Sequence, residues 1–257
     1  MTNLFIGARY LFTGFGLIKQ AGLRRYVAIP LLINIVVFSL LVLFGANQFE
    51  GLMELLLPGG DSWWAGAARV VLWTVFAFVV LLGFYFLFTL VANIIASPFN
   101  GLLAEKVQLK LGQSLPQTHG WASAFTGFPK AMTSEARKLL YFLLIVAALL
   151  VLTVIPVVNV VAPILWPLFT GWMLTLEYIA YPMEVSGHLF PAVRRKAREN
   201  RMMALGFGLA VMLCTMIPLI NFLVIPAAVA GASAMWVERW SRRSTRRPSL
   251  DDTIVNP

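Results

Sequence analysis

The sequence predicts an all-α integral membrane protein, and two long segments without charge are the main reason. Val70–Ala96 covers 27 residues and Val27–Phe44 covers 18, and neither contains a charged side chain. A helix needs about 20 apolar residues to cross a bilayer, so the first can span with some tilt and the second is just long enough. Hydrophobic residues make up 60% of the chain and charged residues only 12%, which argues against a soluble domain.

The basic residues are distributed asymmetrically around these two spans. Nineteen of the 20 Lys and Arg residues lie before Val27 or after Ala96, whereas the intervening segment holds only Arg69 together with three acidic residues. Cytoplasmic loops of membrane proteins carry such an excess of positive charge, so we expect both termini in the cytoplasm and residues 45–69 outside. Topology and contact with anionic membrane lipids then account for the net charge of +9, and nucleic-acid binding is not expected.

The second half of the chain predicts two helical hairpins of similar design. One apolar arm stops at Pro156 and another at Pro218, and the sequence Ile-Pro-Val-Val-Asn ending at Asn159 matches Ile-Pro-Leu-Ile-Asn ending at Asn221. Both turns lack charge and would suit the membrane interior, where the asparagines could bond carbonyls freed by the prolines. We therefore expect two re-entrant, half-penetrating hairpins. Two full-span hairpins remain the alternative, because arms of 16 to 20 residues could nearly span.

The remaining segments complete the predicted architecture. Apolar residues recur at helical spacing from Leu4 to Ile18, which is typical of an amphipathic helix lying in the membrane interface. Residues 97–101, around Pro98, are expected to break or kink the chain, and a charged amphipathic helix follows over Leu102–Leu111. We expect residues 1–240 to form a single membrane domain and residues 241–257 a basic, disordered cytoplasmic tail.

Several kinds of chemistry find no support in the sequence. No phosphate-cradling glycine loop is present, so ATP hydrolysis is not expected. His119 and His188 lie in polar segments far from a second metal ligand, the aspartates lie outside the apolar segments, and Cys214 is the only cysteine. We therefore expect neither an enzyme nor a protein with a cofactor or a metal site.

The best candidate for a binding site is the sequence Gly22-Leu23-Arg24-Arg25 directly before the first span. A glycine permits close approach of a backbone, a helix start offers unpaired N–H donors, and two arginines add planar charged donors. The combination suits an oxyanion at the membrane surface, although positive residues before a span also serve topology. Because the segment supplies only donors, it favours sulfate over monohydrogen phosphate, whose proton requires an acceptor.

Polar residues inside or near the apolar segments are candidates for lining a pathway. The asparagines among them could equally bond between helices. The residues of this kind are Asn34, Asn93, Asn100, Glu105, Glu177 and Glu238. Four arginines also share one helical face, which indicates either contact with lipid headgroups or a vestibule that gathers anions: Arg194, Arg195, Arg198 and Arg201.

At this point the chain resembles the CysZ family of bacterial inner-membrane sulfate transporters. The resemblance covers roughly Leu4 to Trp240 and rests on five segments in the same order. These are residues 22–34 (Gly-Leu-Arg-Arg leading into Ile-Pro-Leu-Leu-Ile-Asn), 97–105 (Ser-Pro-Phe-Asn-Gly-Leu-Leu-Ala-Glu), 162–166 (Ala-Pro-Ile-Leu-Trp), 215–221 (Thr-Met-Ile-Pro-Leu-Ile-Asn) and 231–238 (Gly-Ala-Ser-Ala-Met-Trp-Val-Glu).

This resemblance implies high-affinity sulfate uptake for cysteine biosynthesis, without ATP hydrolysis and with sulfite as a possible competitor. It also implies two long membrane helices with two half-penetrating hairpins, assembled as homodimers or larger oligomers. It places sulfate at Gly22, Leu23, Arg24 and Arg25, and pore residues at Asn34, Asn93, Glu105 and Trp236. The alternative function is a non-transporting membrane scaffold or regulator of a cysteine-synthesis complex.

Overall fold

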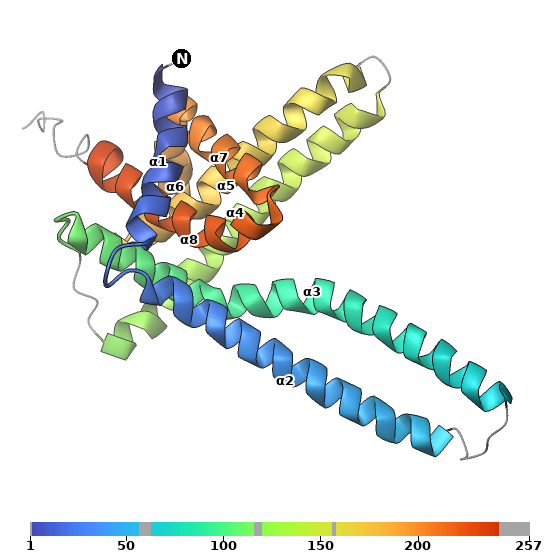
Figure 1. The fold of residues 1–257 in the computed structure, drawn as a ribbon. Coiled ribbons are helices and arrows are strands. Elements are labelled where there is room, and N and C mark those ends of the chain that lie inside the picture. Colours follow the sequence, from blue (N-terminus) through green and yellow to red (C-terminus); the bar gives the residue numbers. More distant parts are fainter. Residues whose placement is uncertain (1, 57–62, 116–119, 156–157, 242–257) are drawn as a thin grey trace, which may run out of the picture. The chain divides into compact units, whose positions relative to one another are not determined.

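The computed structural model describes residues 2–56, 63–115, 120–155 and 158–241, and all regular structure in these ranges is helical (Figure 1). The side chains of some helical stretches, chiefly 84–97 and 120–132, are outside the description. Four described helical segments are long and apolar enough to cross a membrane: Arg25–Phe49, Thr133–Val154, Asn159–Val185 and Ile220–Ser241. The prediction of an all-helical protein with helices long and apolar enough to cross a membrane is thus confirmed, and the expected tail from residue 242 onward lies outside the described residues.

The chain divides into two compact units, and the smaller one is the helical pair over Arg25–Phe99. It contains α2 (Arg25–Leu56) and most of α3 (Trp63–Lys110), so both predicted spans are helical. The ring of Phe49 stacks on Phe76 with centroids 4.0 Å apart and meets Trp73 edge-on at 4.8 Å, which ties α2 to α3. Helix α3 continues through Pro98, so the expected break is absent at that point.

The larger unit, residues 1–24 and 100–257, is built around α1 (Thr2–Ile18), which packs against α7 (Arg201–Thr215) and α8 (Pro218–Met235). Glycines make this packing close. A Cβ atom built on Gly7 would collide with the backbone of α7 at Met203, and one on Gly14 would collide with the backbone of α8 at Ala227. Small residues at helix interfaces allow this approach of backbones, which is common between membrane helices.

The helix predicted from the apolar stripe over Leu4–Ile18 is present as α1, and part of that stripe is buried. Leu11 is 0% and Ile18 5% exposed, whereas Phe12 is 61% exposed. The buried face also includes Gly7 and Gly14, which a stripe of large hydrophobic residues does not contain. Helix α1 is therefore part of the core of this unit.

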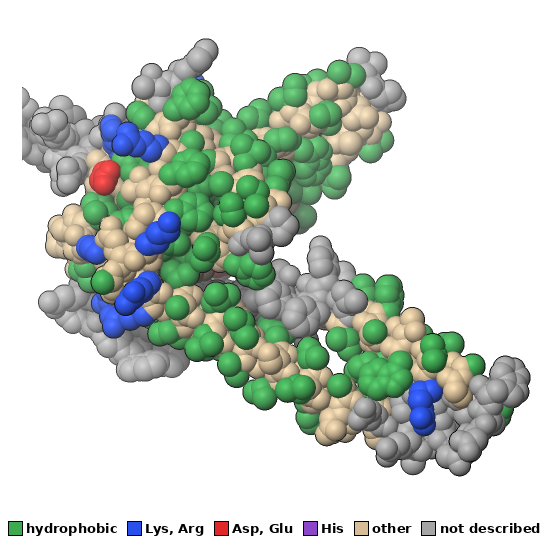
Figure 2. Space-filling view, viewed as in Figure 1, with side chains coloured by type: hydrophobic (Ala, Val, Ile, Leu, Met, Phe, Trp, Pro, Cys, Tyr) green, Lys and Arg blue, Asp and Glu red, His purple; other side chains and the backbone are tan. Residues whose placement is uncertain are grey.

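At the position of each predicted hairpin, two helices are separated by a short turn. In the first, α4 (Gly120–Val154) is followed by a short 3₁₀ turn and α5 (Ala162–Val185), and in the second α7 is followed by α8. The short α6 (Phe190–Glu199) connects the two hairpins, and a π-helical turn, Trp236–Ser241, ends the described chain. In Figure 1 the α4–α5 hairpin projects from this unit, and Figure 2 shows hydrophobic side chains over its described part.

The repeat is visible in the backbone of both turns. The Asn159 N–H donates to the Ile155 carbonyl and the Asn221 N–H to the Ile217 carbonyl, each over 2.9 Å. The two asparagine side chains are exposed, and neither makes a hydrogen bond with another described residue. The predicted turns are therefore closed by the asparagine backbone, and the expected bonds from their side chains are not seen among the described residues.

Candidate functional site

Residues 22–25 form a tight turn between α1 and α2. Gly22 has a φ of +89°, a conformation that strains any residue with a Cβ. The Leu23 side chain is 3% exposed and anchors the turn, whereas both arginines are exposed. Arg25 is the first residue of α2, so the first N–H groups of that helix lack intrahelical acceptors and follow directly after the turn.

Two backbone N–H groups of this turn already have acceptors within the protein. The N–H groups of Leu23 and Arg24 both donate to the Gln20 carbonyl, at 3.1 and 3.3 Å. They are used within the turn and are not free for an anion. The available donors are then the exposed guanidinium groups and the first turn of α2.

The charge around the turn is positive and unbalanced. Within the described part of the chain, no carboxylate forms an ion pair with Arg24 or Arg25. Arg25 contacts the next side chain, because its Nη2 donates to the Tyr26 hydroxyl at 3.1 Å and its guanidinium lies 5.0 Å from the centre of that ring. Stacking of this kind holds an arginine in place while most of its N–H donors stay available.

Trp236, a predicted pore residue, belongs to a buried polar cluster. Its side chain is 4% exposed, and its indole N–H donates to the Ser186 hydroxyl at 3.2 Å. Ser186 in turn donates to Gln108 Oε1 at 2.9 Å, and the Gln108 amide donates to the Pro182 carbonyl at 3.2 Å. The cluster fixes α5, the end of α3 and the π-helical turn together, a constraint that sequence spacing alone does not reveal.

The three acidic residues expected near the pathway each have a partner. Glu105 pairs with its neighbour Lys106 at 3.0 Å, and Glu238 Oε2 accepts a hydrogen bond from the Tyr10 hydroxyl at 2.8 Å. Burial raises the pKa of Tyr10 above its usual value, so this hydroxyl keeps its proton and remains a donor. The partner of Glu177 comes from a different helix.

Lys138 and Glu177 form an ion pair between α4 and α5 that the sequence does not predict. Lys138 Nζ lies 3.1 Å from Glu177 Oε2 and 2.9 Å from Glu135 Oε2, and the lysine residue is only 9% exposed. Glu135 and Lys138 are three residues apart on one helix face, and this spacing is the feature of the sequence from which part of the cluster could be predicted. The pair to Glu177 holds the charged ends of the first hairpin together.

The two asparagines among the predicted pore residues lie on α2 and α3. Asn34 is 9% exposed, and its Oδ1 atom is buried without a hydrogen-bond donor among the described residues. Such an acceptor costs free energy unless a donor is supplied from outside the described side chains. Asn93 lies within α3, but its side chain is outside the described residues.

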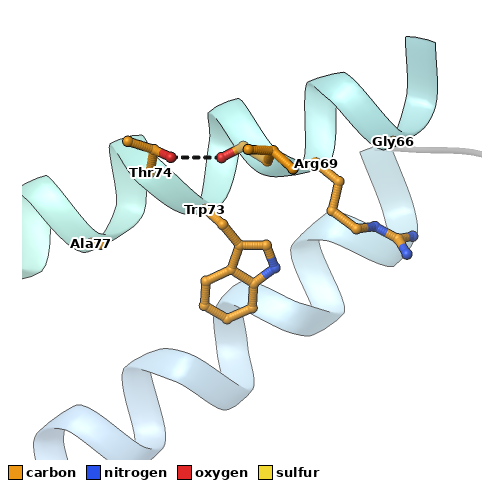
Figure 3. Close-up of a pocket in the computed structure, with 6 residues that line it drawn as sticks. Gly66, Arg69, Trp73, Thr74 and Ala77 are labelled. Atoms are coloured by element: carbon orange, nitrogen blue, oxygen red, sulfur yellow. Dashed lines mark hydrogen bonds between the residues drawn. The ribbon is translucent and has the colours of Figure 1, made fainter. Parts of the chain in front are cut away.

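A shallow groove of about 540 Å³ lies along the first part of α3 (Figure 3). Arg69 is the one charged residue among those described around it, and the apolar remainder includes Trp73 and Ala77. Thr74 uses its hydroxyl to donate to the Val70 carbonyl at 2.8 Å. The groove therefore offers a single cation and few other donors, which makes it a poor oxyanion site. No group of three residues suited to a metal ion occurs among the described side chains.

Comparisons with known proteins agree with these features. The family described as "Sulfate transporter CysZ/Etoposide-induced protein 2.4" matches residues 10–226. The chain is 40% identical over 242 residues to a protein of Pseudomonas paraeruginosa named sulfate transporter CysZ, covering 94% of this chain and 98% of that protein. A protein of the same name from Pectobacterium atrosepticum is 37% identical over 244 residues, covering 94% and 88% of the two chains.

Proposed function

The chain belongs to the sulfate transporter CysZ family, and on this basis we propose that it carries sulfate across the bacterial inner membrane for cysteine biosynthesis, with Gly22–Arg25 as the first binding site. The observation that carries the proposal is the exposed pair Arg24 and Arg25, which no described carboxylate neutralises. Two guanidinium groups beside the start of a helix suit an anion that carries two negative charges. Both chain termini lie in the cytoplasm in this proposal, and the protein acts as a homo-oligomer.

The donor character of this segment leads to a prediction about selectivity. In a mildly alkaline buffer, sulfate and monohydrogen phosphate both carry two negative charges, but only phosphate has a proton to donate. We expect calorimetry on the purified protein to show sulfate binding about tenfold more tightly, because an unpaired donor group in the site costs roughly 1–3 kcal/mol. Equal affinity for the two anions would contradict a site made of donors alone.

The pathway beyond this entry site involves the two broken hairpins. Helix α7 has 15 residues, which at 1.5 Å per residue is about 22 Å and shorter than a bilayer core of about 30 Å. Its turn to α8 carries no charge that would favour water. The proposal therefore keeps the second hairpin half-penetrating. The arms of the first hairpin contain Thr133–Val154 and Asn159–Val185, which are each long enough to cross a membrane, so for that hairpin the proposal rests on the repeated turn alone. Broken helices at membrane depth are tolerated where they face protein or a water-filled cavity.

The depth of the two turns gives a second prediction. With Cys214→Ser as background, single cysteines at Asn159 and Asn221 should resist a membrane-impermeant thiol reagent added outside intact cells, because half-penetrating turns do not reach that side. A cysteine at Gly66, in the segment expected outside, is the matched control and should react quickly. Labelling of the turn positions as rapid as the control would establish full-span hairpins.

A passive pathway must move sulfate against the membrane potential. Moving one charge against 100 mV costs about 2.3 kcal/mol, so inward movement of sulfate opposes roughly 4.6 kcal/mol. This equals a concentration ratio of a little over three powers of ten. Metabolic consumption of sulfate supplies the gradient in this proposal, with at most weak proton assistance. Glu105 is the first candidate for such assistance, ahead of Glu177 and Glu238, because it is the one of the three that the family resemblance implies as a pore residue.

A further inference from the structure

An apolar groove of about 590 Å³ lies between α4, α5, the end of α6 and the start of α7 in the larger unit. Its wall includes Leu149 of α4 and Leu165, Phe169 and Trp172 of α5, and two arginines, Arg198 and Arg201, line the same groove. Helices α4 and α5 both contain segments apolar enough to cross a membrane. The groove therefore combines an apolar wall that suits a hydrocarbon chain with two permanent positive charges.

The two arginines have no counter-charge within the part of the protein that the structure describes. Both are exposed, and none of the described carboxylates forms an ion pair with Arg198 or Arg201. Glu199, which lies between them in the sequence, instead faces Lys196, with Nζ and Oε2 3.7 Å apart. Two uncompensated guanidinium groups on one groove are complementary to an anionic headgroup.

A third arginine strengthens the positive charge near the groove. The Arg194 guanidinium lies 4.2 Å from the centre of the Tyr141 ring, and the Tyr141 hydroxyl accepts a hydrogen bond from the indole N–H of Trp172 at 3.0 Å. Trp172 lines the groove itself. The Arg194 Nε atom is buried and finds no acceptor among the described residues. A buried charged donor without an acceptor is stabilised when an anion comes within hydrogen-bond distance.

We propose that this groove is a specific site for a phospholipid with an anionic headgroup, whose phosphate contacts Arg198 and Arg201 and whose acyl chain lies against Leu165, Phe169 and Trp172. An inorganic anion would leave the apolar wall without contacts, whereas a zwitterionic lipid would bring a positive group to the arginines. Basic residues at the end of membrane helices attract anionic lipids, and here an apolar wall adjoins them. This site is separate from Gly22–Arg25 in sequence and does not depend on its role.

The proposal is tested with short-chain lipids on the full-length protein in detergent. We expect dioctanoyl phosphatidylglycerol to bind about tenfold more tightly than dioctanoyl phosphatidylcholine, because the chains are identical and only the headgroup charge differs. The double variant Arg198→Ala/Arg201→Ala should lose this preference. The matched control, Arg9→Ala/Arg195→Ala, removes two exposed arginines that do not line the groove and should retain the preference.

Two outcomes would overturn the proposal. Equal binding of the two lipids to the unaltered protein would show that the headgroup charge is not recognised, and this comparison requires no variant to fold. Binding of inorganic sulfate or glycerol phosphate as tight as that of phosphatidylglycerol, with the same loss in Arg198→Ala/Arg201→Ala, would identify the groove as a vestibule for free anions.

Discussion

Replacing Gly14 by alanine is expected to destabilise the larger unit by about 1–3 kcal/mol, the usual cost of inserting a methyl group into a packed core. A Cβ atom at this position would collide with the Ala227 carbonyl of α8 and lie 2.8 Å from the Gly231 nitrogen. Both neighbours are backbone atoms, so no side-chain rotation can relieve the contact. The measurement is chemical or thermal unfolding of the purified protein in detergent.

Gly16 provides a matched control two residues further along the same helix. Apart from the neighbouring residues and backbone of its own helix, no described atom lies within 4 Å of a Cβ built there, and the residue is exposed. Gly16→Ala should therefore leave stability unchanged or increase it by up to about 1 kcal/mol, because alanine favours the helix over glycine. If both variants changed stability equally, the close packing of α1 against α8 would not be a feature of the folded protein.

The second large effect concerns the proposed sulfate site. Arg24→Ala should weaken sulfate binding more than tenfold, because the loss of a charge-assisted hydrogen bond costs about 1.5–3 kcal/mol and 1.4 kcal/mol is tenfold. Arg24→Lys should restore only part of the affinity, since the positive charge returns without the planar pair of donors. Isothermal titration calorimetry on the purified variants measures both changes.

Two observations separate this effect from a general change in surface charge. Arg9→Ala removes an exposed positive charge from the neighbouring helix and should leave sulfate affinity within about twofold of the unaltered protein, as expected for a charge screened by salt. An unchanged affinity in Arg24→Ala itself would show that sulfate binds elsewhere on the chain.

Much of the architecture could be predicted because it depends on local properties. The absence of charge over Val27–Phe44 and Val70–Ala96 predicts membrane-length helices, and α2 and α3 contain both segments. Proline cannot continue a helix without losing a hydrogen bond, so helix ends were predicted at Pro156 and Pro218. Helices α4 and α7 end at Val154 and Thr215, within three residues of these prolines. Pro98 shows the limit of this rule, because α3 continues through it.

The features that the sequence did not predict depend on contacts between distant segments. Tyr10 and Glu238 are 228 positions apart, and the partner of Glu177 is Lys138 on another helix. Charge and hydropathy patterns within one helix contain no information about such pairs. The close contact of Gly14 with the backbone of α8 was missed for a related reason, because a pattern of large apolar residues does not include glycine.

The most direct test of the account is labelled-sulfate uptake into liposomes that contain this protein alone. We predict uptake without ATP or a partner protein, accelerated by an imposed inside-positive potential because sulfate carries two negative charges, and only weakly affected by an inward proton gradient. Arg24→Ala liposomes should show markedly slower uptake at low sulfate concentration. Absence of uptake by correctly inserted protein would contradict transport by this chain alone, and uptake that requires a proton gradient but ignores the potential would contradict the passive pathway.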